Sequence, residues 1–150
     1  MTDIPVAIAD TNALYRLFTP KDPLHATHRQ ALAQTGHLVV SPMVLAELDY
    51  LLTSRIGGSV ARNALDFIAR QAEARRFEIP DTAPHLRASI AVMGGYADAD
   101  GGAGVGLADA MNVALAAAFR TADLFTTDRH YRTMRPLTGQ HAFRLLPEDL

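Results

Sequence analysis

Short apolar runs alternate along this chain with longer segments in which apolar residues recur every three or four positions. The apolar runs predict strands at residues 6–9, 37–40, 77–80, 123–127 and 142–147. The longer spacing predicts helices at residues 11–18, 25–33, 42–56, 60–74, 85–93 and 107–120. Because strands and helices alternate throughout, the pattern favours an α/β fold with a parallel sheet covered by helices on both faces.

Capping and breaking residues support these boundaries. Ser41-Pro42 is typical of a helix start, because a hydroxyl residue at the N-cap and proline at the first helical position both favour one. Gly57-Gly58 ends the same helix. The acidic, glycine-rich segment Gly94–Gly106 has no such pattern, and we expect a mobile loop there. The last apolar run, 142–147, is expected to be an edge strand.

The composition is that of one globular domain. The chain has 150 residues, 49% hydrophobic and 20% charged, so a single domain spanning 1–150 with a full core is expected. It has no cysteine, which excludes disulfides and thiolate metal sites. We see no signal peptide and no membrane-length apolar stretch, and we expect a soluble, cytoplasmic protein. Because the formal net charge is −2, any contact with nucleic acid requires a local basic patch.

Four acidic residues stand where they can converge. Asp10 and Asp128 each follow a predicted strand, and the carboxyl ends of parallel strands meet at one edge of a sheet. Glu47 and Asp109 lie early in helices, from which they can point over the same edge. Carboxylates gathered in a cleft repel one another, and hard divalent cations such as Mg²⁺ or Mn²⁺ relieve that repulsion. The arrangement suits metal-assisted phosphodiester hydrolysis, in which the metal lowers the pKa of a bound water.

Each of these acids also has a structural explanation when it is taken alone. Glu47 could be an exposed helix residue, and Asp109 could interact with the positive end of its helix. Asp128 could cap the turn that follows its strand. It is the joint placement of all four that favours a metal site.

Around these acids the sequence resembles the four acidic motifs of PIN-domain nucleases. The motifs are Ala9-Asp10-Thr11-Asn12-Ala13-Leu14, Val44-Leu45-Ala46-Glu47-Leu48, Gly106-Leu107-Ala108-Asp109-Ala110 and Phe125-Thr126-Thr127-Asp128-Arg129. They occur in the family's order, with spacings like those of its short bacterial members, the VapC-type toxins of toxin–antitoxin pairs. The resemblance extends over nearly the whole chain and includes the closing His130-Tyr131 and Phe143-Arg144-Leu145-Leu146-Pro147.

The resemblance implies a site and a chemistry. The family's metal-binding acids are matched by Asp10, Glu47, Asp109 and Asp128. Among these, Asp10 and Asp109 are the implied direct ligands. Asn12 and Thr126 match polar residues that support the site through hydrogen bonds. The implied activity is Mg²⁺-dependent endoribonuclease cleavage, with Mn²⁺ as a substitute ion.

The same resemblance implies a fold and partners. The fold is a PIN-like three-layer α/β/α sandwich with a mainly parallel central sheet of four or five strands. Similar toxins cut structured RNA such as transfer or ribosomal RNA, are silenced by a cognate antitoxin protein, and are typically homodimers. The segment Gly94–Gly106 is longer and richer in glycine than usual, which bears on the choice of substrate more than on the chemistry.

The densest basic stretch of the chain follows the fourth acid. Arg129, His130 and Arg132 are candidates for contacts with RNA phosphates beside the metal site. A solvated surface helix explains the same residues equally well. A general-base role for His130 is unnecessary where a metal activates the water.

Two other functions stay open on the sequence alone. The first is another Mg²⁺-dependent phosphohydrolase, such as a phosphatase with Asp10 as its nucleophile. The familiar haloacid dehalogenase-like phosphatases carry a second aspartate two residues later, where this chain has Asn12. The second is a non-catalytic PIN-like RNA-binding module, which the loss of an acid would favour, and no acid is lost.

Overall fold

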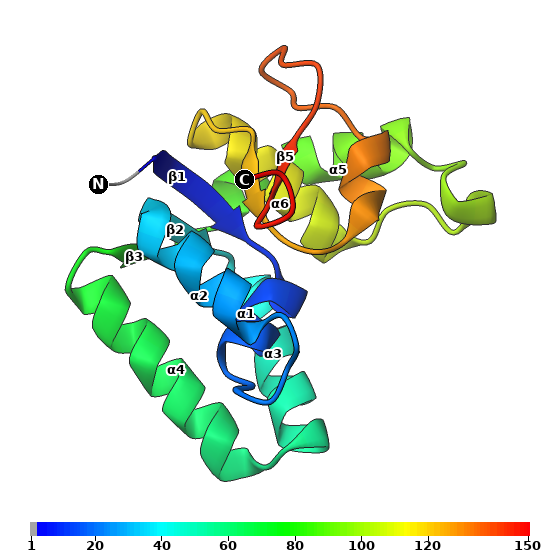
Figure 1. The fold of residues 1–150 in the computed structure, drawn as a ribbon. Helices are drawn as coiled ribbons and strands as arrows, with labels where there is room; N and C mark the ends of the chain where they lie inside the picture. Colours follow the sequence, from blue (N-terminus) through cyan, green and yellow to red (C-terminus); the bar gives the residue numbers. More distant parts are fainter. Residues whose placement is uncertain (1–2) are drawn as a thin grey trace.

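A central parallel sheet organises the protein, whose residues 3–150 are described by a computed structural model (Figure 1). Within these residues the strands are β1 (Ile4–Ala9), β2 (Thr35–Val40), β3 (Phe77–Glu78), β4 (Asp123–Phe125) and β5 (Arg144–Leu146). Their order across the sheet is β3-β2-β1-β4-β5, and every neighbouring pair is parallel. The described part of the chain therefore confirms the expected sheet, with five strands, all parallel, and β5 at an edge.

Helices cover both faces of this sheet (Figure 1). They are α1 (Thr11–Leu17), α2 (His25–Gln34), α3 (Pro42–Arg55), α4 (Gly58–Glu73), α5 (Leu86–Gly95) and α6 (Leu107–Ala118). Helices α1 to α4 share one core cluster with Ala7 and Ala9 of β1, whereas α5 and α6 share a second cluster with Ile8. Because successive strand residues point to opposite faces, these clusters lie on the two sides of the sheet. The predicted three-layer α/β/α sandwich is confirmed.

Strand β1 lies in the middle of the sheet and brings its C-terminal end beside those of two neighbours. Ala9 is in register with Val40 of β2 and with Phe125 of β4. The main-chain N–H of Asp10 donates to the carbonyl of Phe125 at 2.9 Å. The polar residues that follow β1 and β4 therefore meet at one edge of the sheet.

Helix α3 begins as its sequence predicts. The hydroxyl of Ser41, which is fully buried, accepts a hydrogen bond from the main-chain N–H of Met43 at 3.2 Å, and Pro42 is the first helical residue. The cap satisfies one of the main-chain donors that a helix start leaves without an internal partner. The helix therefore starts directly at the end of β2.

Several predicted elements are shorter in the structure than in the sequence pattern, among them the strands predicted at 77–80 and 142–147, which cover Phe77–Glu78 and Arg144–Leu146. The strand predicted at 123–127 ends at Phe125; the main-chain N–H of Thr126 still donates to the carbonyl of Leu146 at 3.1 Å, but that of Thr127 turns to Oδ1 of Asn12. The helix predicted at 107–120 ends at Ala118, and Arg120 then takes a left-handed backbone conformation with φ of 54°. No helix within residues 3–150 is long and apolar enough to cross a membrane.

Main-chain hydrogen bonds give parts of the segment Gly94–Gly106 a regular structure. Its first two residues complete α5, and Asp100–Gly102 forms a short 3-10 helix, η2. The main-chain N–H groups of Gly102 and Gly104 both donate to the carbonyl of Ala99, at 3.1 and 2.8 Å. Gly104 has φ of 74°, a left-handed conformation that favours glycine. The expected loop therefore begins after the end of α5 and contains a short 3-10 helix.

Candidate metal centre

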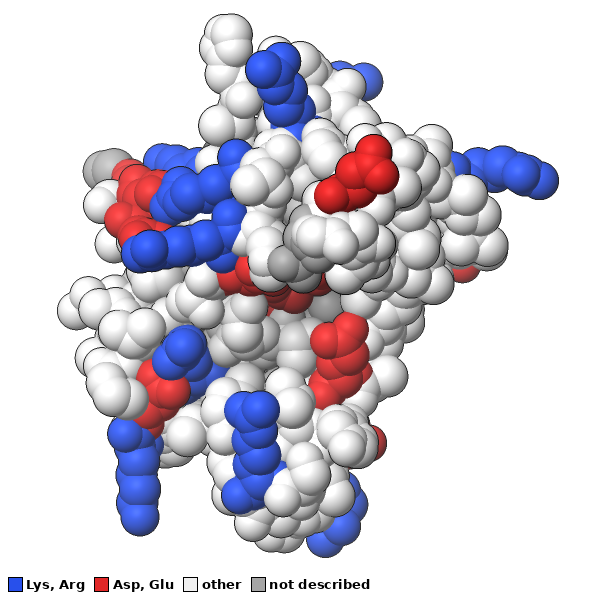
Figure 2. Space-filling model, turned by 90° about the vertical axis from the view of Figure 1, so that its right-hand side faces the viewer, with Lys and Arg blue, Asp and Glu red and all other residues white. Residues whose placement is uncertain are grey.

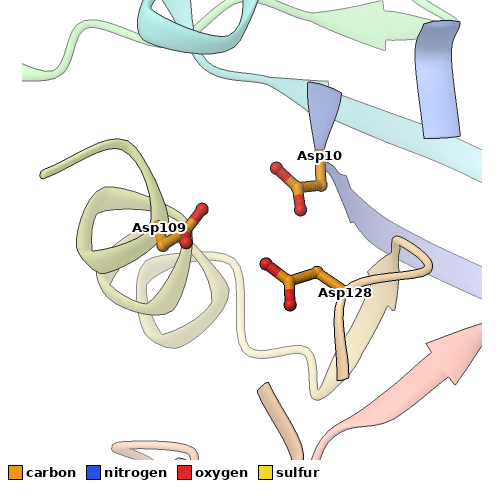
Figure 3. A group of neighbouring side chains, drawn as sticks. All are labelled: Asp10, Asp109 and Asp128. Atoms are coloured by element: carbon orange, nitrogen blue, oxygen red, sulfur yellow. The ribbon is translucent and has the colours of Figure 1, made fainter. Parts of the chain in front are cut away.

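Three carboxylates converge beyond the C-terminal edge of the sheet. Asp10, Asp109 and Asp128 each offer an oxygen atom, and these atoms all lie within 4.8 Å of one another. Figure 3 shows the side chains pointing toward a common space from the end of β1, the first turn of α6 and the segment after β4. Three of the four predicted acids are thus brought together, although Asp109 is 99 positions from Asp10 in the chain (109 − 10).

Asp10 is oriented by hydrogen bonds to both of its carboxylate oxygens. It is the N-cap of α1, and its Oδ1 accepts from the main-chain N–H of Thr11 at 2.9 Å. Its Oδ2 accepts from the hydroxyl of Thr126 at 2.8 Å and from Nδ2 of Asn12 at 3.2 Å. Because Asp10 is only 6% exposed, these bonds hold the carboxylate in one orientation.

Asn12 and Thr126 connect the two strand ends. Oδ1 of Asn12 accepts from the main-chain N–H of Thr127 at 2.8 Å and from the Thr127 hydroxyl at 3.1 Å. The hydroxyl oxygen of Thr126 accepts from the main-chain N–H of Asp128 at 3.0 Å. Through these contacts both residues connect Asp10 to the segment that carries Asp128.

Asp109 is held by a buried tyrosine on the opposite side of the cluster. The hydroxyl of Tyr131 donates to Oδ1 of Asp109 at 3.1 Å, and it accepts from Nδ2 of Asn112 at 3.2 Å. Tyr131 and Asn112 are each 1% exposed, and Oδ1 of Asn112 has no hydrogen-bond partner among the described residues. The chain Asn112–Tyr131–Asp109 therefore orients the second carboxylate from within the core.

The sequence interpretation did not assign a role to Tyr131 or Asn112. Two signals were present. Asn112 is a polar residue within the otherwise apolar run of α6, one turn after Asp109. Tyr131 follows Asp128 by three residues, but the sequence alone does not show that its hydroxyl turns toward Asp109.

Asp128 occupies the third position and begins the next element. Its Oδ1 accepts from the main-chain N–H of His130 at 2.9 Å, so Asp128 caps the 3-10 helix η3 (Arg129–Thr133). The imidazole Nδ1 of His130 lies 3.0 Å from the same oxygen. The side chain of Asp128 is 27% exposed, and the cluster is therefore open to solvent on this side. Asp128 therefore both caps η3 and belongs to the acidic cluster.

The acidic cluster is electrostatically costly without a counter-charge. Burial raises the pKa of Asp10 from 3.8 to about 7, and the charge of Asp109 adds to this shift, whereas hydrogen bonds from Thr126 and Thr11 oppose it. Burial also raises the pKa of Asp109, against the hydrogen bond from Tyr131. A divalent cation between these carboxylates would favour their charged forms.

Glu47 lies beside the cluster but outside the group of three. It is an exposed residue of α3, and its Oε2 accepts from the hydroxyl of Thr11 at 3.2 Å. The charge of Glu47 contributes to the raised pKa of Asp109, so it faces the same space. In this arrangement Glu47 borders the cluster at its exposed rim.

The predicted RNA-contacting arginines are engaged in ion pairs with the end of the chain. Arg129 lies 2.8 Å from Glu148, and Arg132 lies 3.0 Å from Glu148 and 2.9 Å from Asp149. These pairs are exposed, so each contributes little to stability and can exchange partners. Figure 2 shows acidic atoms in a hollow near the middle of one face, with Lys and Arg side chains to its left and below it and further acidic side chains to its right.

The donor set fits a hard divalent cation. Every side-chain group in the cluster is a carboxylate, and oxygen ligands are those that Mg²⁺ and Mn²⁺ prefer. Asp10 and Asp109 are oriented by neighbours that leave carboxylate oxygens directed at the shared space (Figure 3). The residues present therefore suit the ion that the sequence pattern predicts.

Known proteins are similar in sequence to this chain over most of its length. Residues 7–135 match the model of the PIN domain family. Over 143 residues the chain is 34% identical to Ribonuclease VapC26 of Mycobacterium tuberculosis, and the alignment covers 93% of this chain and 99% of that protein. The chain therefore belongs to the PIN-domain family, and within it to the VapC-type ribonucleases.

Solved structures share the fold at low sequence identity. Mycobacterium tuberculosis VapC20, described as a sarcin-ricin loop cleaving toxin, matches with a TM-score of 0.66 and 19% identity, over 82% of this chain and 89% of that one. VapBC2 of Rickettsia felis, bound to a DNA fragment from its promoter, matches with a TM-score of 0.62 and 17% identity, over 88% and 95% of the two chains. These matches confirm the PIN-like fold.

Proposed function

We propose that this protein is a Mg²⁺-dependent endoribonuclease that hydrolyses RNA phosphodiester bonds at the cluster of Asp10, Asp109 and Asp128, with Glu47 as a fourth acid at its rim. The observation that carries the proposal is the convergence of three carboxylates within 4.8 Å around a buried Asp10 whose pKa is about 7. The full-length similarity to a VapC ribonuclease supports the choice of RNA as substrate.

In this proposal Asp10 and Asp109 hold the cation directly, and Asp128 completes the oxygen donors. A Mg²⁺ ion at this place supplies an activated water nucleophile and neutralises charge on the phosphodiester. Thr126, Asn12 and Tyr131 keep the carboxylates in position through the hydrogen bonds described above. Mn²⁺ meets the same requirement for oxygen ligands and can substitute.

Arg129, His130 and Arg132 are proposed to meet the RNA backbone next to the cluster. Because Arg129 and Arg132 are paired with exposed carboxylates at the end of the chain, an incoming phosphate can replace those partners without desolvating a buried charge. His130 lies beside Asp128 and can approach the same phosphate. These contacts position the substrate and carry no sequence information of their own.

We further propose that the protein is the toxin of a toxin–antitoxin pair, cuts structured RNA such as transfer or ribosomal RNA in the cytoplasm, and forms a homodimer. Toxin–antitoxin proteins are among the structures that share its fold, including a complex from Klebsiella pneumoniae with a TM-score of 0.57 and 23% identity, over 82% of this chain and 87% of that one. A cognate antitoxin would silence the toxin by covering the acidic cluster.

The experiment that tests the proposed activity is cleavage of total RNA by the purified protein with Mg²⁺ or with EDTA. The Asp10→Asn variant is compared at the same concentration, after circular dichroism confirms that it is folded. Discrete fragments that require both Mg²⁺ and Asp10 would support the nuclease. Cleavage that persists in EDTA, or in the folded Asp10→Asn variant, would contradict it, because contaminating ribonuclease or another site would then account for the fragments.

A further inference from the structure

A small cavity lies directly beside the acidic cluster and shares one residue with it. The cavity has a volume of about 220 Å³, and Asp109 forms part of its lining. The Gly94–Gly106 segment contributes Gly104 and Val105 to one wall, and His130 and Met134 contribute to the other. A group that occupies this cavity is therefore next to the atoms proposed to act on the RNA backbone.

The walls of the cavity are held in place by contacts on both sides. Val105 packs against the core cluster that contains Met134, which is 2% exposed. The hydroxyl of Tyr96 accepts a hydrogen bond from the main-chain N–H of Arg135 at 3.0 Å, which connects the Gly94–Gly106 segment to the residues after η3. The cavity is thus formed by hydrogen-bonded and packed elements.

The charge of the lining favours a neutral occupant. Neither lysine nor arginine is found among the described residues that line the cavity, whereas Asp109 supplies a carboxylate. A phosphate in this cavity would find no lysine or arginine to pair with among these described residues, whereas the phosphate of the cleaved bond lies outside it, at the cation proposed for the acidic cluster. The apolar side chains of Val105 and Met134 instead suit a flat nucleobase, and the exposed imidazole of His130 at the rim can stack on one.

Two polar side chains of the lining, those of Thr133 and Asp109, act as hydrogen-bond acceptors. The hydroxyl of Thr133 donates its proton to the carbonyl of His130 at 2.7 Å, so its oxygen has only lone pairs to offer. The carboxylate of Asp109 is also an acceptor. A base with an exocyclic amino group, such as adenine, cytosine or guanine, can donate from that group to these acceptors, whereas uracil offers only its ring N–H, which lies between two carbonyl oxygens that the same acceptors repel.

We propose that this cavity receives one nucleobase adjacent to the cleaved phosphodiester and favours an amino-bearing base over uracil, with Thr133 as a specificity-determining residue. The inference rests on the proposed ribonuclease function and adds to it a defined base site. It also gives the Gly94–Gly106 segment a role, because that segment forms one wall of the site.

The test compares cleavage of short single-stranded RNAs in which each position near the cut is varied in turn among the four bases. With the unaltered protein, we expect one position at which uracil lowers kcat/KM about tenfold relative to the preferred amino-bearing base. Thr133→Val keeps the shape of the side chain and removes the acceptor, so this preference should fall to less than about twofold. Thr53→Val, the same change on the exposed face of α3, should keep the preference.

A second variant tests occupancy of the same cavity. Val105→Phe adds an aromatic ring to the wall of the cavity. It should raise KM for RNAs that carry a base at the varied position, whereas kcat for an RNA that lacks this base should stay unchanged. Its melting temperature and the melting-temperature increase on adding Mg²⁺ show that the fold and the metal site are intact. If Val105→Phe fails to fold, the Thr133→Val result decides alone.

The outcomes separate this inference from the function on which it rests. If the unaltered protein cleaves RNA in a Mg²⁺- and Asp10-dependent way, but with no base preference or with a preference that Thr133→Val leaves unchanged, the base site is refuted and the ribonuclease stands. If the folded, Mg²⁺-binding protein cleaves neither total RNA nor any of the short RNAs, both proposals fail. Loss of the preference in Thr133→Val alone, with Thr53→Val unchanged, supports the base site.

Discussion

Asp10 shows at the scale of a single residue how one carboxylate serves structure and chemistry together. It caps α1 through Oδ1 and accepts from Thr126 and Asn12 through Oδ2, yet its burial and the charge of Asp109 raise its pKa to about 7. The hydrogen bonds stabilise the charged form, whereas burial and like charge destabilise it. Neighbouring residues therefore fix the orientation of Asp10, and a cation would offset the cost of its charged form.

Replacing Asp109 by asparagine should not destabilise the metal-free protein. Asp109→Asn removes a negative charge that faces Asp10, and the amide oxygen can still accept from Tyr131. We expect the free energy of unfolding in EDTA at pH 8, measured with urea, to equal or exceed that of the unaltered protein. The matched control is Asp123→Asn, which removes a carboxylate paired with Arg144 at 2.8 Å and should lower stability. A clear loss of stability in Asp109→Asn would contradict the electrostatic explanation.

Tyr131→Phe should weaken binding of Mg²⁺, because it removes the hydrogen bond that orients Asp109. Loss of a partner that orients a metal ligand typically costs about 10- to 100-fold in metal affinity. We expect at least a tenfold rise in the Mg²⁺ concentration needed for half of the maximal increase in melting temperature.

A double variant separates this orienting role from simple loss of stability. Tyr131→Phe leaves the buried amide of Asn112 without its partner, so the single variant should also be less stable. Adding Asn112→Leu removes that amide and should restore stability without restoring Mg²⁺ affinity. Recovery of both properties together would mean that Tyr131 acts only through packing.

At the scale of elements, helix starts place side chains at the edge of the sheet. Asp10 caps α1, Ser41 caps α3 and Asp128 caps η3, so three caps follow directly on the ends of β1, β2 and the segment after β4. A capping residue must turn its side chain back toward the first main-chain N–H groups. For Asp10 and Asp128, the residue that begins the helix therefore also supplies a carboxylate to the cluster.

Ser41→Ala should lower the free energy of unfolding by about 1 kcal/mol, which is typical for loss of an N-cap hydroxyl. The reason is that the main-chain N–H of Met43 loses its acceptor at the start of α3. Chemical denaturation is the measurement, and Ser59→Ala, an exposed serine of α4 that is not the N-cap, is the control. Equal effects of the two substitutions would show that the Ser41 hydroxyl does not stabilise the helix start.

At the scale of the whole molecule, the acidic cluster links the stability of the fold to pH and to metal. The raised pKa of Asp10 means that between its unfolded value of 3.8 and its folded value of about 7 the folded protein binds a proton that the unfolded chain has lost. Stability contributed by this proton is fully present below pH 3.8 and is lost as the pH rises through 7. The cost of the charged cluster is then largest above pH 7.

We therefore expect Mg²⁺ to increase the melting temperature more at pH 8 than at pH 5. At pH 8 the cation offsets the repulsion between ionised carboxylates, whereas at pH 5 protonated Asp10 competes with it. Thermal unfolding with Mg²⁺ and with EDTA at the two pH values measures this difference, and the Asp10→Asn variant should show a much smaller one. An increase that is equal at both pH values would contradict the linkage.

The sequence by itself determined the order of elements and the edge at which the site lies. Hydrophobic periodicity separates strands from helices because it reflects which face of each element is buried, and Ser41-Pro42 marks a helix start through local hydrogen bonding. Parallel strands then bring Asp10 and Asp128 to one edge, since Asp10 directly follows β1 and Asp128 follows the end of β4 at Phe125 after two intervening residues. These conclusions depend on residues that are close together in the chain.

Only the tertiary structure decided which side chains actually meet. The contact of Tyr131 with Asp109 depends on how α6 packs against η3, and Glu47 borders the cluster because α3 presents it near Thr11. The ion pairs that engage Arg129 and Arg132 likewise depend on where the end of the chain returns to the sheet. These contacts join residues 17 to 36 positions apart, and their geometry is set by packing between elements that local sequence patterns do not encode.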